Sequence, residues 1–200
     1  MRFKFNLFLK NILKKYFIFL FLFSIFSCQP IEDFDEIIFD NNILTKITIN
    51  ANKKFINEIY QISYVDPYID HSIKNPPVLR LKNWLNQNIS IFGSQNTLVI
   101  NIIDASLTRT ERKNNDKKKY QEVNEFFYEI NFIVEYELYD DSNYIIATST
   151  AKAIRSTTSS KFISINEKER IIDTLILDAL LDISLKSEEL IKAHMKQFIL

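Results

Sequence analysis

The strongest constraint on the fold is a stretch in which apolar and polar side chains alternate. The apolar positions share one parity and are Phe126, Tyr128, Ile130, Phe132, Val134, Tyr136 and Leu138. The polar positions of the other parity are Glu129, Asn131, Glu135 and Glu137. Because successive side chains of a strand point to opposite faces, this pattern predicts a long strand with one buried and one hydrated face. An antiparallel sheet covered on one face meets that requirement.

Weaker alternation on both sides of this stretch predicts the neighbouring strands. Residues 43–51 alternate and predict a first strand, whereas residues 56–77 lack a clear period, contain three prolines and read as an ordered loop. The two-residue period holds from 97 to 157, apart from a charged turn and a second turn at 140–143. In the last strand, the small side chains of Ala147, Ser149, Ala151 and Ala153 would let a helix approach closely.

Two helices are predicted from apolar residues spaced three and four apart. The first carries its apolar face at Leu81, Trp84, Leu85 and Ile89. Asn75 is its expected N-cap, and Gly93 is its expected left-handed C-cap. The second helix runs from Asn166 to about Gln197 without Gly or Pro, and Ser164 with Glu167 forms a capping box at its start.

The order of these elements predicts an α+β fold. It reads strand, helix, three strands, helix, which corresponds to a two-layer sandwich. We expect an antiparallel sheet of about four strands with both helices on one face. Residues 43–200 are long enough for a single domain.

The first 27 residues differ from the rest of the chain. Their only charges are five basic residues, and the apolar run at 16–26 is too short to span a bilayer but fits a secretory signal. The run ends in Ile25-Phe26-Ser27-Cys28, which resembles a bacterial lipobox, and Cys28 is the only cysteine. This resemblance implies a signal peptide at 1–27, then an acylated Cys28 with an acidic tether at 28–42. Gln29 favours the outer membrane over the inner membrane.

Composition narrows the chemistry of the exported chain. Removal of the signal deletes five basic residues and no acidic ones, which leaves 20 basic against 25 acidic residues and a net charge of about −5. A mildly acidic domain is a poor general binder of nucleic acid. One glycine and two histidines supply neither a phosphate-binding loop nor a zinc ligand set, so no cofactor or metal is expected.

A basic segment between the second and third strands is the most distinctive polar feature. Its cations are Arg109, Arg112, Lys113, Lys117, Lys118 and Lys119. Clustered cations at the tip of a hairpin favour contact with the phosphates of anionic lipids or with a partner protein. The alternative interpretation is a solvated turn without a ligand.

Asp70 and His71 are the only residues that resemble part of a catalytic dyad. A carboxylate beside a histidine can orient an imidazole as a general base. However, the sequence has no Gly-x-Ser-x-Gly nucleophile elbow, and adjacent side chains in a loop point apart. A lipid-anchored hydrolase that uses His71 is therefore kept only as an alternative.

Several segments resemble those of known envelope lipoproteins. Pro67-Tyr68-Ile69-Asp70-His71, Trp84-Leu85 and Ile103-Asp104-Ala105-Ser106 resemble an uncharacterised alphaproteobacterial lipoprotein family. The element order is similar to that of the lipoprotein of lipopolysaccharide assembly and of the auxiliary lipoproteins of lipid-transport ABC systems. The resemblance implies a fold of two layers and no catalytic or ligand set.

The sequence therefore predicts a non-enzymatic lipoprotein on the periplasmic face of the envelope. We expect it to act as an accessory or adaptor protein in outer-membrane assembly or lipid transport, attached through its lipid and bound to an envelope protein or lipid. Its partner surface would include the hydrated sheet face, where Phe127, Ile133 and Tyr139 interrupt the polar residues. A structural lipoprotein that oligomerises through an open sheet edge is the other alternative.

Overall fold

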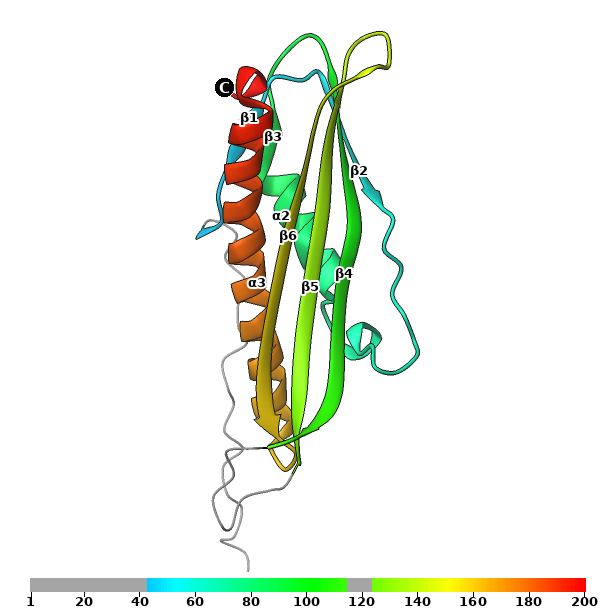
Figure 1. Ribbon diagram of the computed structural model, residues 1–200, viewed down its shortest axis with the longest axis vertical. Coiled ribbons are helices and arrows are strands. Elements are labelled where there is room, and N and C mark those ends of the chain that lie inside the picture. The colour runs from blue at the N-terminus through cyan, green and yellow to red at the C-terminus, as the bar shows by residue number, and fades with distance from the viewer. Residues whose placement is uncertain (1–42, 115–123) are drawn as a thin grey trace, which may run out of the picture. The chain divides into compact units, whose positions relative to one another are not determined.

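The computed structural model describes residues 43–114 and 124–200, which belong to one compact unit. Its centre is a sheet with the strand order β2-β4-β5-β6 (Figure 1). The strands are β2 (Lys53–Glu58), β4 (Thr97–Lys113), β5 (Asn124–Tyr139) and β6 (Ile145–Ser160). β2 runs parallel to β4, and the other two pairs are antiparallel.

Two helices cover one face of this sheet. They are α2 (Pro77–Asn88) and α3 (Ile165–His194). The Tyr136 hydroxyl on β5 donates to Ser187 of α3 at 2.8 Å, which places α3 on the face predicted to be buried. Arg80 of α2 forms an ion pair with Asp173 of α3, so the two helices are also in direct contact. The predicted two-layer α+β sandwich is confirmed.

A second, two-stranded sheet lies at one end of the helices. β1 (Ile47–Ile49) pairs in parallel with β3 (Ile89–Ile91). The C-terminal residues join it, because Asn50 N donates at 2.7 Å to the carbonyl of Phe198, the last residue of the 3-10 turn η3 (Lys196–Phe198). Residues 43–51 therefore start a separate small sheet rather than the main one.

The core lies between the sheet and the helices. The apolar parity of β5 is fully buried from Tyr128 to Leu138, as the alternation predicts. Under α3, β6 contributes Ser149, Ala151 and Ala153, all buried, and the helix contributes larger side chains such as Ile176 and Leu180. The small residues of β6 thus leave room for the helix, in agreement with the sequence.

The strand next to β4 corrects the sequence analysis. β2 begins after the predicted first strand and extends into the predicted loop, and it makes the sheet mixed rather than antiparallel. Four of its six residues are exposed, and the other two, Lys54 and Ile56, are half-buried. A short strand at a sheet edge needs little apolar alternation, and the sequence therefore carries no clear signal for it.

The ends of α2 also differ from the prediction. The N-cap is Pro76 rather than Asn75, and the helix ends at Asn88, followed by β3 instead of a left-handed glycine. Lys54 of β2 takes the capping role, since its ammonium donates to the carbonyls of Leu85, Asn86 and Ile89. A cation at the C-terminus of a helix satisfies free carbonyls and suits the helix dipole. Burial lowers the pKa of Lys54.

Gly93 is required by close packing rather than by its backbone angles. A Cβ atom at this position would lie 2.2 Å from Asn50 Oδ1 and 3.1 Å from Ala51 N. Any larger residue would therefore displace the Asn50 side chain and press against the backbone of Asn50 and Ala51.

Candidate functional site

The basic residues at the end of β4 are placed on both faces of the sheet. Arg109 is opposite the buried Tyr128 in the register, so it points to the helix-covered face. Arg112 is opposite Glu125 on the hydrated face, and Lys113 ends the strand. Lys117, Lys118 and Lys119 lie outside the described residues, so their role stays a prediction.

Arg112 is held by a carboxylate and by an aromatic ring. Its Nε donates to Glu125 Oε1 at 2.7 Å, and its guanidinium lies 4.6 Å from the centroid of Phe127. Half of the Arg112 side chain remains exposed. The cation is thus oriented while it stays available to an anion.

A second pair of cations flanks Phe126 on the helix-covered side. Arg109 lies 4.9 Å and Lys161 5.6 Å from the centroid of this ring. Lys161 comes from the turn between β6 and α3, and its ammonium also contacts Glu111 at 2.5 Å. This turn therefore packs beside the end of the β4–β5 hairpin.

The same turn exposes two large apolar side chains. Phe162 is 85% exposed and Ile165 is 75% exposed. The turn is held by local bonds, because Phe162 N donates to Ser160 Oγ and Glu167 N donates to Ser164 Oγ at 3.1 Å. The second of these bonds confirms the predicted N-cap of the long helix.

We call the cations and apolar residues at this end of the sheet the basic end. It consists of Arg109, Arg112, Lys113, Lys161, Phe162 and Ile165. Glu125 pairs with Arg112 and Glu111 pairs with Lys161, so two of the four cations are paired with carboxylates. Sequence reasoning identified three of the six residues. It missed the other three because a turn 50 positions away from Glu111 gives no local sign of its neighbour.

Asp70 and His71 do not form a dyad, because the Asp70 carboxylate anchors its segment to β4 and to Tyr60. Asp70 is fully buried at the start of the 3-10 turn η2 (Asp70–Ser72), and its carboxylate accepts from Leu107 N at 2.9 Å and from the Tyr60 hydroxyl. His71 is exposed, and its Nδ1 lies 3.1 Å from the Ser63 carbonyl oxygen. Burial and the bond to Asp70 raise the pKa of Tyr60. Each carboxylate oxygen of Asp70 therefore holds a group other than the imidazole.

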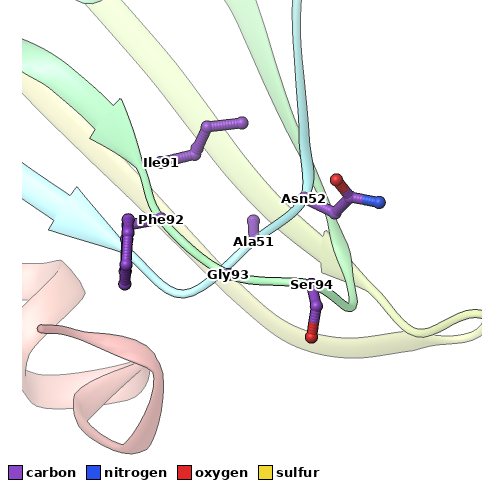
Figure 2. Close-up of a pocket in the computed structure, with 6 residues that line it drawn as sticks. All are labelled: Ala51, Asn52, Ile91, Phe92, Gly93 and Ser94. Atoms are coloured by element: carbon purple, nitrogen blue, oxygen red, sulfur yellow. The ribbon is translucent and has the colours of Figure 1, made fainter.

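One open hollow of about 460 Å³ lies beside the small sheet. Figure 2 shows its lining on two neighbouring segments, 51–52 and 91–94. The lining residues are Ala51, Asn52, Ile91, Phe92, Gly93 and Ser94. None of these side chains titrates, so the hollow offers neither an acid nor a base.

The hydrated sheet face is joined by polar side chains across three strands. Asn57 donates to Asn101, which in turn donates to Glu135 at 3.1 Å and Glu137 at 3.2 Å. The apolar residues expected to form a partner surface there are only half-buried, and they are Phe127, Ile133 and Tyr139. The Tyr139 hydroxyl donates to Glu137, which raises the pKa of Tyr139.

The described residues contain no cluster of metal ligands and no membrane-spanning helix. Within residues 43–114 and 124–200, His, Cys, Asp and Glu side chains form no cluster of three or more that would hold a metal ion. In the same ranges, neither α2 nor α3 combines the length and the apolar character needed to cross a membrane. Cys28 and the predicted signal and tether lie outside the described residues.

Comparisons with known proteins assign no family. No protein-family model matches the sequence, and no curated protein matches it. Among solved structures, the chain is similar to a minor lipoprotein from Acinetobacter baumannii, at 14% sequence identity and a TM-score of 0.38. The similarity covers 72% of this chain and 93% of that one, and at this level it carries no argument about function.

Proposed function

We propose that this protein is a non-enzymatic accessory lipoprotein on the periplasmic face of the cell envelope. Cys28 carries the lipid, and Gln29 directs the protein to the outer membrane. The basic end binds the phosphate groups of anionic lipids, in support of envelope assembly or lipid transport.

The observation that carries this proposal is the combination of chemistry at the basic end. Arg112 and Lys161 are held near aromatic rings and carboxylates, while Phe162 and Ile165 are exposed beside them. Each cation near an anionic surface contributes about 1 kcal/mol of attraction. Exposed aromatic and aliphatic side chains add binding when they enter the boundary between headgroups and acyl chains.

The geometry around Asp70 favours an accessory role over hydrolysis. A carboxylate that orients a catalytic histidine must accept a hydrogen bond from the imidazole. The two oxygens of Asp70 instead accept from Tyr60 and Leu107, and the His71 ring lies 5.3 Å from that of Tyr64 at a tilt of 34°.

The lipid anchor is tested in cells that produce the full-length chain. Labelled palmitate should enter the wild-type protein, and Cys28→Ser should abolish the label and release the protein from the membrane fraction. Acylation provides several buried chains, each CH₂ of which contributes about 0.8 kcal/mol, so the wild-type protein should remain bound. An unlabelled wild-type chain would end this part of the proposal.

The basic end is tested with the acylated full-length protein inserted by its lipid into neutral phosphatidylcholine vesicles. Addition of phosphatidylglycerol vesicles should produce clustering that is measured by light scattering. The double variant Lys113→Glu with Phe162→Ser should reduce clustering several-fold, because it removes a cation and an exposed aromatic ring. The control is Lys192→Glu with Leu79→Ser, on helix surfaces away from the basic end. Equal clustering by both double variants would contradict the proposal.

A further inference from the structure

One cation of the basic end lacks a hydrogen-bond acceptor. Arg109 is half-buried on β4, and within residues 43–114 and 124–200 neither a carboxylate nor a carbonyl accepts from its guanidinium. Its guanidinium lies over the ring of Phe126, 4.9 Å from the centroid. A guanidinium carries five N–H donors, and donors that are partly removed from water without an acceptor cost free energy. Arg109 therefore has donor capacity that the described residues leave unused.

The other arginines of the described residues are either paired or exposed. Three of them form ion pairs with a carboxylate, namely Arg80 with Asp173, Arg112 with Glu125 and Arg155 with Asp182. Arg170 is exposed on α3. Among these arginines, only Arg109 is both half-buried and without an acceptor.

The surroundings of Arg109 suit an anion that carries an apolar chain. Its nitrogens remain accessible to solvent, so a ligand can reach them. Lys161 lies 5.6 Å from the centroid of the same Phe126 ring, and Glu111 balances its charge. The unbalanced charge at this ring is therefore that of Arg109. Next in the chain after Lys161 is the exposed Phe162, which offers an apolar contact beside the cations.

We propose that Arg109 binds the phosphate of one anionic lipid, with the acyl chains directed toward Phe162 and Ile165. This inference rests on the proposed function, in which the basic end contacts anionic lipids, and it assigns a discrete site to one residue. A planar guanidinium can donate two parallel hydrogen bonds to two oxygens of a phosphate, a geometry that an ammonium does not reproduce. Arg112 is less suited, because on the hydrated face its Nε already donates to Glu125.

The first test is protection of Arg109 from phenylglyoxal, a reagent that modifies accessible guanidinium groups. The acylated full-length protein is held in neutral phosphatidylcholine vesicles, and the modified residues are located by mass spectrometry. Dihexanoyl phosphatidylglycerol should slow the modification of Arg109 several-fold. The exposed Arg170 is the internal control and should react at the same rate with and without this lipid. Unchanged reaction at Arg109, or equal slowing at both arginines, would overturn the proposal.

A second arm separates a lipid headgroup from free phosphate. Inorganic phosphate offers the same oxygens without acyl chains, so half-maximal protection of Arg109 should need a several-fold higher concentration than with the lipid. Equal concentrations would assign the site to free phosphate and overturn its assignment to a lipid.

A conservative variant tests the geometry of the site. Arg109→Lys keeps the charge but loses the paired donors, and its dissociation constant for dihexanoyl phosphatidylglycerol should rise about tenfold, as for the loss of one hydrogen bond to a charged group. Titration calorimetry on the same vesicles measures this constant, with protein-free vesicles as the blank. The matched control is Arg155→Lys, an arginine of β6 that Asp182 holds, and it should bind as the wild type does. Circular dichroism verifies that both variants are folded. Unchanged binding by Arg109→Lys would contradict the proposal.

These outcomes are distinct from those that test the proposed function. Because Arg109→Lys preserves the net charge, phosphatidylglycerol vesicles should still cluster with this variant. Clustering by the wild type without protection of Arg109 would remove the discrete site and leave the proposed function intact. Absence of clustering by the wild type would instead contradict the proposed function, whatever the reaction of Arg109.

Discussion

The two edges of the main sheet are treated in opposite ways. On one side, β2 covers the first part of β4, and the chain then continues along β4 through backbone bonds from Tyr60 to Ile102 and from Ile69 to Leu107. On the other side, the described residues leave β6 without a neighbouring strand. The first edge is closed by hydrogen bonds within the plane of the sheet. At the second edge, α3 packs against one face of β6.

This difference shows that a sheet edge can be closed by irregular chain as well as by a strand. The segment from Ile59 to Ser72 contains little regular structure, and Asp70 fastens it to β4 and to Tyr60. Asp70 therefore accepts from one backbone N–H of β4, that of Leu107, which a longer β2 would otherwise satisfy. β6 instead has small inward residues, which allow α3 to pack closely against it.

The largest expected effect comes from opening the covered edge. Asp70→Ala leaves the buried Leu107 N–H and the Tyr60 hydroxyl without their acceptor, and we expect a loss of about 3 kcal/mol in the free energy of unfolding. Urea denaturation measures the loss, and hydrogen exchange at the Leu107 amide should accelerate. Asp141→Ala, at an exposed turn, is the control. A loss no greater than that of the control would mean that Asp70 does not close the edge.

The next effect concerns the support beneath the open edge. Ala151→Leu adds volume where β6 meets α3, and overpacking of a buried position should destabilise the protein by about 2 kcal/mol. Thermal unfolding measures the change, with the exposed Thr150→Leu on the same strand as the matched control. If both substitutions have the same small effect, close packing of α3 does not support this edge.

A smaller effect, which depends on pH, comes from Tyr60. Tyr60→Phe removes one hydrogen bond to a carboxylate and should cost about 1.5 kcal/mol at neutral pH. Because the pKa of Tyr60 is raised in the folded protein, the unfolded chain releases this proton first, and the stability of the wild type falls as the pH rises above about 10. The gap between wild type and variant should therefore narrow there. A gap that widens with pH would contradict the assignment.

The smallest effect on stability is expected at the open edge itself. Lys152→Thr changes an exposed side chain and should alter the free energy of unfolding by no more than about 0.5 kcal/mol. Urea denaturation provides the measurement. A loss well above this value would mean that the Lys152 side chain helps to hold the edge strand.

Prediction from sequence succeeded where the signal is local. The alternation from Phe126 to Leu138, the apolar face of α2 and the Ser164 cap all describe contacts within a few residues, and each is found as expected. The same reasoning failed for β2 and for the C-cap of α2, because Lys54 reaches Ile89 across 35 positions of the chain. It located Arg109, Arg112 and Lys113 but gave no sign of Lys161 beside them.

The amino-acid sequence alone determined which segments become long strands or helices and which of their faces are buried, since burial follows the period of the apolar side chains. Only the tertiary structure decided which edge of the sheet is covered, which carboxylate fastens it and which cations gather at the basic end. Those outcomes depend on residues brought together by packing, and separations of 37 positions between Asp70 and Leu107 or 50 between Glu111 and Lys161 leave no periodic trace in the chain.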